Sequence, residues 1–224
     1  MAGPGEARRP PGTYNRGMTS APWARLGARL YDPFLALSER RGMAERRGAL
    51  LASARGRVLE IGAGTGLNLA HYPVDLDELL LTEPEPPMRA RLERRVARSG
   101  RAATVLAAPA EALPFADGTF DTVVSTLVLC TVADAPAVLR ELRRVLAPGG
   151  RLLFIEHVRG GAAQLARRQD RLAGPWRAFA QGCRCNQPTL ELFERQGLDV
   201  VELARASWRG MPSVVRPLVI GHAA

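Results

Sequence analysis

The chain has 224 residues, 46% of them hydrophobic, which is enough for one domain with a sizeable core. All 31 basic side chains are arginines, a bias typical of a GC-rich genome, and the absence of lysine excludes a Schiff-base mechanism. No apolar run reaches the ~20 residues of a membrane helix, and the start of the chain lacks the apolar stretch of a signal peptide, so we expect a cytoplasmic bacterial protein without an integral membrane segment.

The net charge of +9 is concentrated near the N-terminus, since residues 1–60 hold eleven arginines against five acidic residues. Beyond Glu60 the charges nearly balance, and only 5% of the chain is aromatic. Arginines interleaved with aromatic residues, as in a nucleic-acid channel, are not found there. We therefore expect no nucleic-acid partner. Nothing in the sequence indicates the oligomeric state.

Cysteine and histidine spacing gives no sign of a metal centre. Cys130, Cys183 and Cys185 form neither a disulfide framework nor a four-ligand zinc pattern, and the three histidines are scattered. We therefore expect no metal site.

The N-terminal region divides into two parts. Residues 1–20 are rich in Pro, Gly and Arg and are expected to be disordered. Residues 23–53 have helical periodicity, interrupted near Tyr31-Asp32-Pro33. The apolar face of these helices is predicted to consist of Leu26, Leu30, Phe34, Leu35 and Leu37.

From Arg55 onward strands and helices alternate, which predicts a parallel sheet with helices on both faces. The strand Val58-Leu59 leads into Glu60-Ile-Gly-Ala-Gly-Thr-Gly66. Glycines in such a loop adopt positive φ and let backbone N–H groups approach a ligand. A dinucleotide fingerprint does not fit, because Leu67 stands where its third glycine belongs.

The next strand, Glu78–Leu81, ends at Thr82-Glu83, about twenty residues after the glycines. A carboxylate at that spacing typically accepts hydrogen bonds from ribose hydroxyls. Glu83 is therefore the best single candidate for a ligand-binding side chain.

A long β-branched run, Phe120–Leu129, is predicted to be a strand buried on both faces, with Ser125–Cys130 lining the ligand side. Asp134 is expected to cap a helix that runs through Leu146 and stops at Pro148-Gly149-Gly150. The following strand, Arg151–Val158, carries Glu156-His157 at its end.

The last part of the chain departs from the alternation. A helix is predicted over Pro188–Gln196, and Leu198–Ser207 and Val214–His222 are two strand-like runs with a short connection. They fit an antiparallel hairpin at the edge of the sheet.

The loop Glu60–Gly66 closely resembles E-x-G-x-G-x-G, the first motif of class I S-adenosylmethionine methyltransferases. Ala108–Phe115 resembles the adenine-side loop of that family, with Pro109 in place of its usual Asp. The resemblance implies an α/β fold: a Rossmann-like seven-stranded sheet with a C-terminal antiparallel hairpin and N-terminal lid helices. It also implies S-adenosylmethionine as cofactor and S-adenosylhomocysteine as product.

The family pattern divides residues 21–224, a single methyltransferase domain, into lid helices (21–54), a cofactor-binding core (55–158), a substrate-side insertion (159–197) and a terminal hairpin (198–224). Its motifs imply the following cofactor-binding residues: Glu60, Gly62, Ala63, Gly64, Gly66, Asn68, Glu83, Pro84, Met88, Ala110, Glu111, Thr126 and Leu127. Because Pro109 has no carboxylate, backbone groups of Ala110 or the Glu111 side chain are the expected substitutes near the adenine. Phe115 is expected either beside the adenine or in the core.

A narrower resemblance, over residues 57–222, is to the alkyl thiol S-methyltransferases of the methyltransferase-like 7 type, which are found on animal microsomes. It rests on Ser125–Val132, Leu142–Gly150, Glu156–Val158, Gly182-Cys183 and Arg216-Pro217. A looser resemblance is to bacterial phospholipid N-methyltransferases. We expect this chain to lack the hydrophobic N-terminal anchor of the microsomal enzymes.

These resemblances imply a small-molecule substrate, with a thiol sulfur favoured as methyl acceptor. An N- or O-methyltransferase of a secondary metabolite or phospholipid headgroup stays open, as does a non-methylating binding or cyclisation role. His157 and Cys130 are the candidate catalytic residues, with His157 either a general base or a structural hydrogen-bonder. The candidate substrate-binding residues are Tyr31, Cys130, His157, Cys183 and Asn186.

Overall fold

The computed structural model describes residues 21–224, so the predicted disorder of residues 1–20 lies outside the described part. The chain begins with helix α1 (Ala21–Ser38), a short π-helical turn η1 (Glu39–Met43) and helix α2 (Ala44–Leu51). Helices were thus predicted correctly for this region, although their break was misplaced.

The break between the two N-terminal helices is at Arg41-Gly42, not at Tyr31-Asp32-Pro33. Gly42 has φ 107°, a left-handed conformation that glycine adopts at little cost. Pro33 instead lies inside α1, on its exposed side, where water can satisfy the carbonyl group that the proline ring leaves without a donor.

The predicted apolar face of α1 is also mostly wrong. Leu35 is 2% exposed, whereas the other four predicted residues are 43–54% exposed. Helix α1 is rotated so that Ala28, Leu35 and Ser38 are on its buried side. Ala28 and Ser38 are small, and Leu35 packs into the third core cluster described below.

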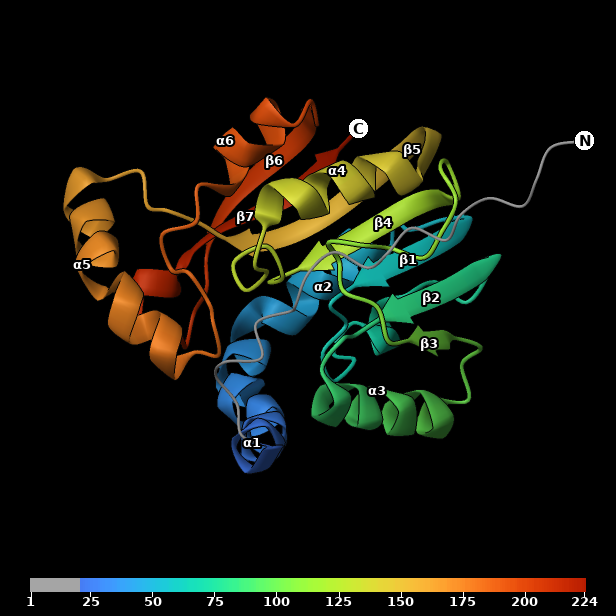
Figure 1. The fold of residues 1–224 in the computed structure, drawn as a ribbon, viewed down its shortest axis with the longest axis horizontal. Helices are drawn as coiled ribbons and strands as arrows, with labels where there is room; N and C mark the ends of the chain where they lie inside the picture. Colours follow the sequence, from blue (N-terminus) through green and yellow to red (C-terminus); the bar gives the residue numbers. More distant parts are fainter. Residues whose placement is uncertain (1–20) are drawn as a thin grey trace, which may run out of the picture.

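A seven-stranded sheet forms the centre of the molecule, with strand order β3-β2-β1-β4-β5-β7-β6 (Figure 1). The first five strands are parallel, and β7 pairs antiparallel with both β5 and β6. This confirms the predicted fold class, including the C-terminal hairpin. The strands are β1 (Arg57–Ile61), β2 (Glu78–Thr82), β3 (Thr104–Leu106), β4 (Phe120–Thr126), β5 (Leu146–His157), β6 (Val200–Ser207) and β7 (Pro217–Ala223).

Helices cover both faces of this sheet. The predicted capping of α4 is confirmed, because the Asp134 carboxylate accepts a hydrogen bond from the Ala137 backbone N–H at 3.0 Å. The predicted helix over 188–196 is also present, as α6. The elements are α3 (Pro86–Ser99), α4 (Ala135–Val145), α5 (Ala163–Phe179), α6 (Thr189–Arg195) and the 3₁₀ turns η2 (Leu69–His71) and η3 (Ser213–Val215).

Several boundaries differ from the sequence predictions. Strand β4 ends at Thr126 because Leu127 has φ 60° and the next backbone N–H groups turn toward Glu156. Strand β5 starts at Leu146, where it pairs with Phe120, rather than at residue 151. Helix α5 was not predicted at all, and η3 shortens the last strand so that it begins at Pro217.

Side-chain alternation along the strands builds one hydrophobic cluster on each face of the sheet. In β1, Val58 belongs to the cluster under α2 and α3, while Leu59 and Ile61 belong to the cluster under α4 and α6. A third cluster, which contains Leu35 and Trp208, lies at one end of the sheet beneath α1. Strands β1, β2 and β4 point toward that end, where α1 and α5 lie (Figure 1).

Within residues 21–224, every helix is too short or too polar to cross a lipid bilayer.

Candidate functional site

The glycine loop after β1 combines tight packing with one open position. Gly62, Gly64 and Gly66 have φ of 55°, 59° and 86°. A Cβ on Gly62 would lie 2.9 Å from Val128, and one on Gly66 would lie 2.7 Å from Leu92. At Gly64 the nearest atom would be 4.0 Å away. The loop therefore has room beside Gly64 for a ligand to approach the backbone, as the predicted cofactor requires.

Glu83 holds this loop against the end of β2. It is 6% exposed, and its two carboxylate oxygens accept hydrogen bonds from the backbone N–H groups of Gly64 at 2.8 Å and Glu85 at 2.9 Å. Burial raises the pKa of this carboxyl group, and the two backbone donors act against that rise. The carboxylate keeps further lone pairs at a buried position, which suits the ribose hydroxyls of the predicted cofactor.

Glu60 and Asn68 belong to a buried polar network. Glu60 accepts hydrogen bonds from the Tyr72 hydroxyl at 2.8 Å and from the Asn68 amide at 2.9 Å, and burial raises its pKa to about 7. Asn68 also donates to the Thr126 hydroxyl and accepts from Arg47 at 2.7 Å. Both oxygens of Glu60 are thus engaged inside the protein, where they order the glycine loop and join it to α2.

Arg47 is a functional candidate that sequence reasoning missed. It is only 4% exposed, and it pairs with Glu39 at 3.1 Å besides its contact with Asn68. A buried arginine costs stability unless its donors are satisfied, so this residue fixes how the N-terminal helices meet the loop. Its place among many arginines gave no signal in the sequence.

Asp32 fastens α1 over the same loop. Its carboxylate accepts a hydrogen bond from the Thr65 hydroxyl at 2.5 Å and pairs with Arg95 of α3 at 2.7 Å. The neighbouring Tyr31 has a buried hydroxyl, and desolvation raises its pKa to about 12. Tyr31 packs against the third core cluster, which also contains Leu35 and Trp208.

The predicted adenine-side loop is mostly held by other parts of the protein. Ala110 is 6% exposed, and the Glu111 carboxylate accepts a hydrogen bond from the Ala133 backbone N–H at 3.0 Å. Phe115 packs edge-on against Phe120, with ring centroids 4.9 Å apart, so it belongs to the core. Two further residues that were predicted to contact the cofactor, Pro84 and Met88, are half-buried near the start of α3.

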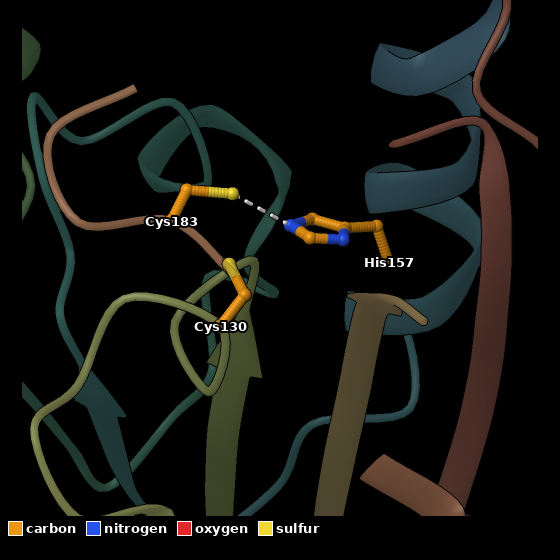
Figure 2. A group of neighbouring side chains, drawn as sticks. All are labelled: Cys130, His157 and Cys183. Carbon is orange, nitrogen blue, oxygen red and sulfur yellow. Dashed lines mark hydrogen bonds between the residues drawn. The ribbon is translucent and has the colours of Figure 1, made fainter. Parts of the chain in front are cut away.

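A second constellation lies where β4 and β5 end. Cys130 is on the loop after β4, His157 is the last residue of β5, and Cys183 is on the loop after α5. Their exposures are 2%, 1% and 8%. The two sulfur atoms and a ring nitrogen lie within 4.8 Å of one another, and Figure 2 shows the three side chains pointing together. The fold has therefore gathered three residues that the sequence analysis selected separately.

Hydrogen bonds within this constellation favour a thiolate on Cys183. Its Sγ lies 3.0 Å from His157 Nε2 and accepts from the Trp176 ring N–H at 3.3 Å. The Cys130 thiol donates to the Leu127 carbonyl at 3.5 Å. The nearby Cys130 thiol, followed by the hydrogen bonds with His157 and Trp176, lowers the pKa of Cys183. The interaction with Cys183 and burial raise the pKa of Cys130. Among the described residues, His157 Nδ1 has no partner.

Glu156 sets the position of Cys130. Its carboxylate accepts hydrogen bonds from the Ser125 hydroxyl at 2.7 Å and from the backbone N–H groups of Val128 and Leu129 at 3.1 and 3.3 Å. Burial raises its pKa to about 7. These bonds hold Leu127 at φ 60°, a conformation that costs a residue with a side chain about 1–2 kcal/mol. Such strain is typical of functional loops.

The side chains of two other predicted residues, Asn186 and Leu127, are engaged outside the constellation. The Asn186 amide donates to Asp170 at 2.9 Å on the exposed side of its loop, beside the ion pair of Asp170 with Arg159. Leu127 is half-buried against the third core cluster. Gln169, which was not predicted, is fully buried and donates to the backbone carbonyls of Cys185 and Val214, so it orders the loop that carries Cys183.

A basic groove of about 1100 Å³ separates α1 from α3, away from the cysteine and histidine constellation. Asp32 contacts two of its arginines, Arg91 and Arg95. The lining of the groove has more arginines than acidic residues, so this part of the surface is positively charged. The arginines that line the groove are Arg25, Arg29, Arg91, Arg94, Arg95 and Arg98.

Comparison with known proteins identifies the family of the chain. Residues 59–154 match a family model described as a methyltransferase domain. The chain is 32% identical to human thiol S-methyltransferase TMT1A over 174 residues, which cover 74% of this chain and 69% of the relative. It is 34% identical to human TMT1B over 163 residues, 71% and 66% of the two chains.

The fold is also similar to that of a SAM-dependent methyltransferase from Thermotoga maritima. The TM-score is 0.63 at 23% identity, and the alignment covers 89% of this chain and 96% of the other.

Proposed function

The chain belongs to the class I S-adenosylmethionine-dependent methyltransferases, and we propose that it methylates the sulfur of a small thiol. The observation that most supports the acceptor is the constellation Cys130, His157 and Cys183 at the ends of β4 and β5. Ligands of open parallel sheets bind beyond the carboxyl ends of the strands, and Glu83 follows the carboxyl end of β2 in the same parallel sheet.

The cofactor end is proposed to be the glycine loop and Glu83. S-adenosylmethionine, when bound, supplies a methyl group on a positively charged sulfur. Backbone groups beside Gly64 approach the ligand, and the Glu83 carboxylate accepts hydrogen bonds from ribose hydroxyls. Glu60, Asn68 and Arg47 hold the loop in this conformation from behind.

The acceptor end is proposed to bind the thiol among buried sulfur and imidazole groups. A free thiol with a pKa near 8.5 is a few per cent ionised at neutral pH, so the protein needs mainly to orient the sulfur. The thiol would give its proton to His157 or to solvent, and its sulfur would form a bond to the methyl carbon. The bond from that carbon to the sulfonium sulfur would break, and its electron pair would stay on the sulfur of S-adenosylhomocysteine.

His157 as general base stays a prediction, with a constraint on how it would act. Its Nε2 faces Cys183 Sγ at 3.0 Å, and the ring is stacked beside Trp208 with centroids 6.2 Å apart. A substrate thiol would therefore have to share or replace the contact with Cys183 in order to give its proton to this nitrogen.

The test uses three acceptors of matched shape, a thiol, the corresponding alcohol and the corresponding amine, each incubated with purified protein and S-adenosylmethionine. Mass spectrometry of the products is expected to find the methyl thioether. Methylation of the amine or alcohol in preference to the thiol would overturn the proposed acceptor and favour an N- or O-methyltransferase. The cytoplasmic location and the lack of a nucleic-acid partner stay predictions.

A further inference from the structure

We propose that Cys130, His157 and Cys183 bind a zinc ion, with a fourth coordination position that takes the sulfur of the acceptor thiol. The metal site rests on the geometry of this chain alone. The role of its fourth position rests on the proposed function.

The donor set is the one that zinc selects. Thiolate and imidazole groups suit this ion, and catalytic zinc sites have three protein ligands and one position for a water molecule or substrate, as in the two-cysteine, one-histidine set of alcohol dehydrogenase. Ligands at the normal zinc distances are roughly 3.4–3.8 Å apart in a tetrahedral site. The three donors lie within 4.8 Å of one another, so small side-chain rotations bring them to that geometry.

The two loops that carry the cysteines are fixed relative to each other. The Arg184 backbone N–H donates to the Cys130 carbonyl at 2.8 Å, which joins the loop after β4 to the loop after α5. Glu156 holds the first loop, and the Trp176 ring N–H is directed at Cys183 Sγ from α5. Donors on such a rigid frame are already close together before an ion binds, which lowers the cost of binding.

Histidine orientation agrees with this assignment. His157 directs Nε2, not Nδ1, toward the sulfur of Cys183 (Figure 2). Binding of zinc through Nε2 places the ring proton on Nδ1 and displaces the proton shared by His157 and Cys183, so uptake of the ion releases protons. Among the described residues, the group of Cys130, His157 and Cys183 contains no carboxylate, so it lacks the oxygen ligands that magnesium and calcium prefer.

The ion gives the site a way to activate a thiol. The acceptor sulfur coordinates to zinc and its proton goes to solvent, because His157 Nε2 is then a ligand and cannot be the general base. A thiolate is therefore present at neutral pH. Its electron pair then forms the new bond to the methyl carbon, as in the step described above. The thioether product carries no charge and is a weaker ligand, so it leaves.

Metal binding is measured first without any acceptor. Protein purified under reducing conditions and stripped with a chelator is titrated with Co²⁺ and then with Zn²⁺. A single bound ion is expected, with the near-ultraviolet sulfur-to-cobalt absorption and the visible bands of a tetrahedral site. Cys183→Ser and Cys130→Ser are each expected to weaken zinc binding at least about a hundredfold, whereas Cys185→Ser, the matched control, leaves it unchanged.

A second measurement uses only the unaltered protein, because a core cysteine variant can fail to fold. Alkylation of the cysteines is followed by mass spectrometry with and without Zn²⁺. Protection of Cys130 and Cys183, with Cys185 unaffected, supports the site. Equal alkylation with and without the ion would overturn it.

Failure of the metal role and failure of the proposed function can be told apart. Thiol methylation that is equally fast in stripped and zinc-loaded protein would overturn the role of the ion and leave the proposed function standing. Binding of cobalt through sulfur without methylation of any thiol would overturn the proposed acceptor but support the metal site.

Discussion

Replacement of Glu83 by glutamine tests the cofactor end of the site most sharply. In the structure the two carboxylate oxygens of Glu83 accept one backbone N–H each, from Gly64 and Glu85. An amide has one accepting oxygen and one NH₂ group. Glu83→Gln therefore leaves one of these two N–H groups facing another donor, at a position that is 6% exposed to solvent.

The size of the effect follows from these two bonds. A hydrogen bond to a charged group contributes about 1.5–3 kcal/mol, and each 1.4 kcal/mol is a factor of ten in affinity. In the variant the glycine loop loses its bound conformation, and cofactor binding has to restore that conformation. The ribose hydroxyls of the cofactor also lose one accepting oxygen. We expect the dissociation constant for S-adenosylmethionine to rise roughly 10–100-fold.

Isothermal titration of S-adenosylmethionine into both proteins measures this change. Glu78→Gln is the matched control, because Glu78 lies at the other end of β2 and its exposed carboxylate pairs with Arg57. An unchanged affinity in Glu83→Gln, or an equal loss in Glu78→Gln, would refute the assignment of Glu83 to the cofactor pocket.

Three further predictions concern the loop, the lid and the buried carboxylate. Gly64→Arg should abolish cofactor binding in a titration, yet lower the free energy of unfolding by only about 1–2 kcal/mol, because the side chain meets open space and the main cost is the positive φ. Asp32→Asn should weaken cofactor binding by a factor of a few, since partly exposed ion pairs contribute about 0.2–1 kcal/mol; binding equal to that of the unaltered protein would remove Asp32 from the lid. Glu156 has a pKa of about 7 when folded against an ordinary 4.5, so its stabilising effect is full below pH 4.5 and is lost as the pH rises toward 7. Glu156→Gln should remove that part of the slope, up to about 1.4 kcal/mol per pH unit in urea unfolding, and leave the similar part due to Glu60; an unchanged slope would contradict the buried, protonated state of Glu156.

The sequence predicted the central sheet well because its signals are local. A buried apolar strand before glycines, a strand-end carboxylate and a capping aspartate each depend on residues close together in the chain, and β1, β2 and α4 follow them. The terminal hairpin was also predictable, because two strand-like runs have too short a connection for a parallel crossover.

The N-terminal helices show where local reasoning ends. Periodicity identified a helix but could not tell which side would be buried, since α1 packs on the end of the sheet and not on its face. Proline was taken as the break, although an exposed position tolerates Pro33 and a positive φ at Gly42 turns the chain.

Long-range contacts account for what was missed at the site. The meeting of Cys130, His157 and Cys183 depends on two loops and a strand end from separate parts of the chain, so their spacing in the sequence could not show that these side chains lie together. The strand after Phe120 was predicted too long because the partner that ends it, Glu156, lies thirty residues later in the sequence. Buried Arg47 and Gln169 likewise take their importance only from contacts made in the folded chain.

The acceptor atom is the central claim, and competition between acceptors measures it directly. Purified protein is given S-adenosylmethionine together with equal amounts of a small thiol, an amine and a phenol, and the methylated products are quantified by mass spectrometry. We predict that the methyl thioether is the main product, formed together with S-adenosylhomocysteine in equal amount. Methylation of the amine or the phenol with the thiol left unreacted, in protein that binds S-adenosylmethionine, would contradict the account.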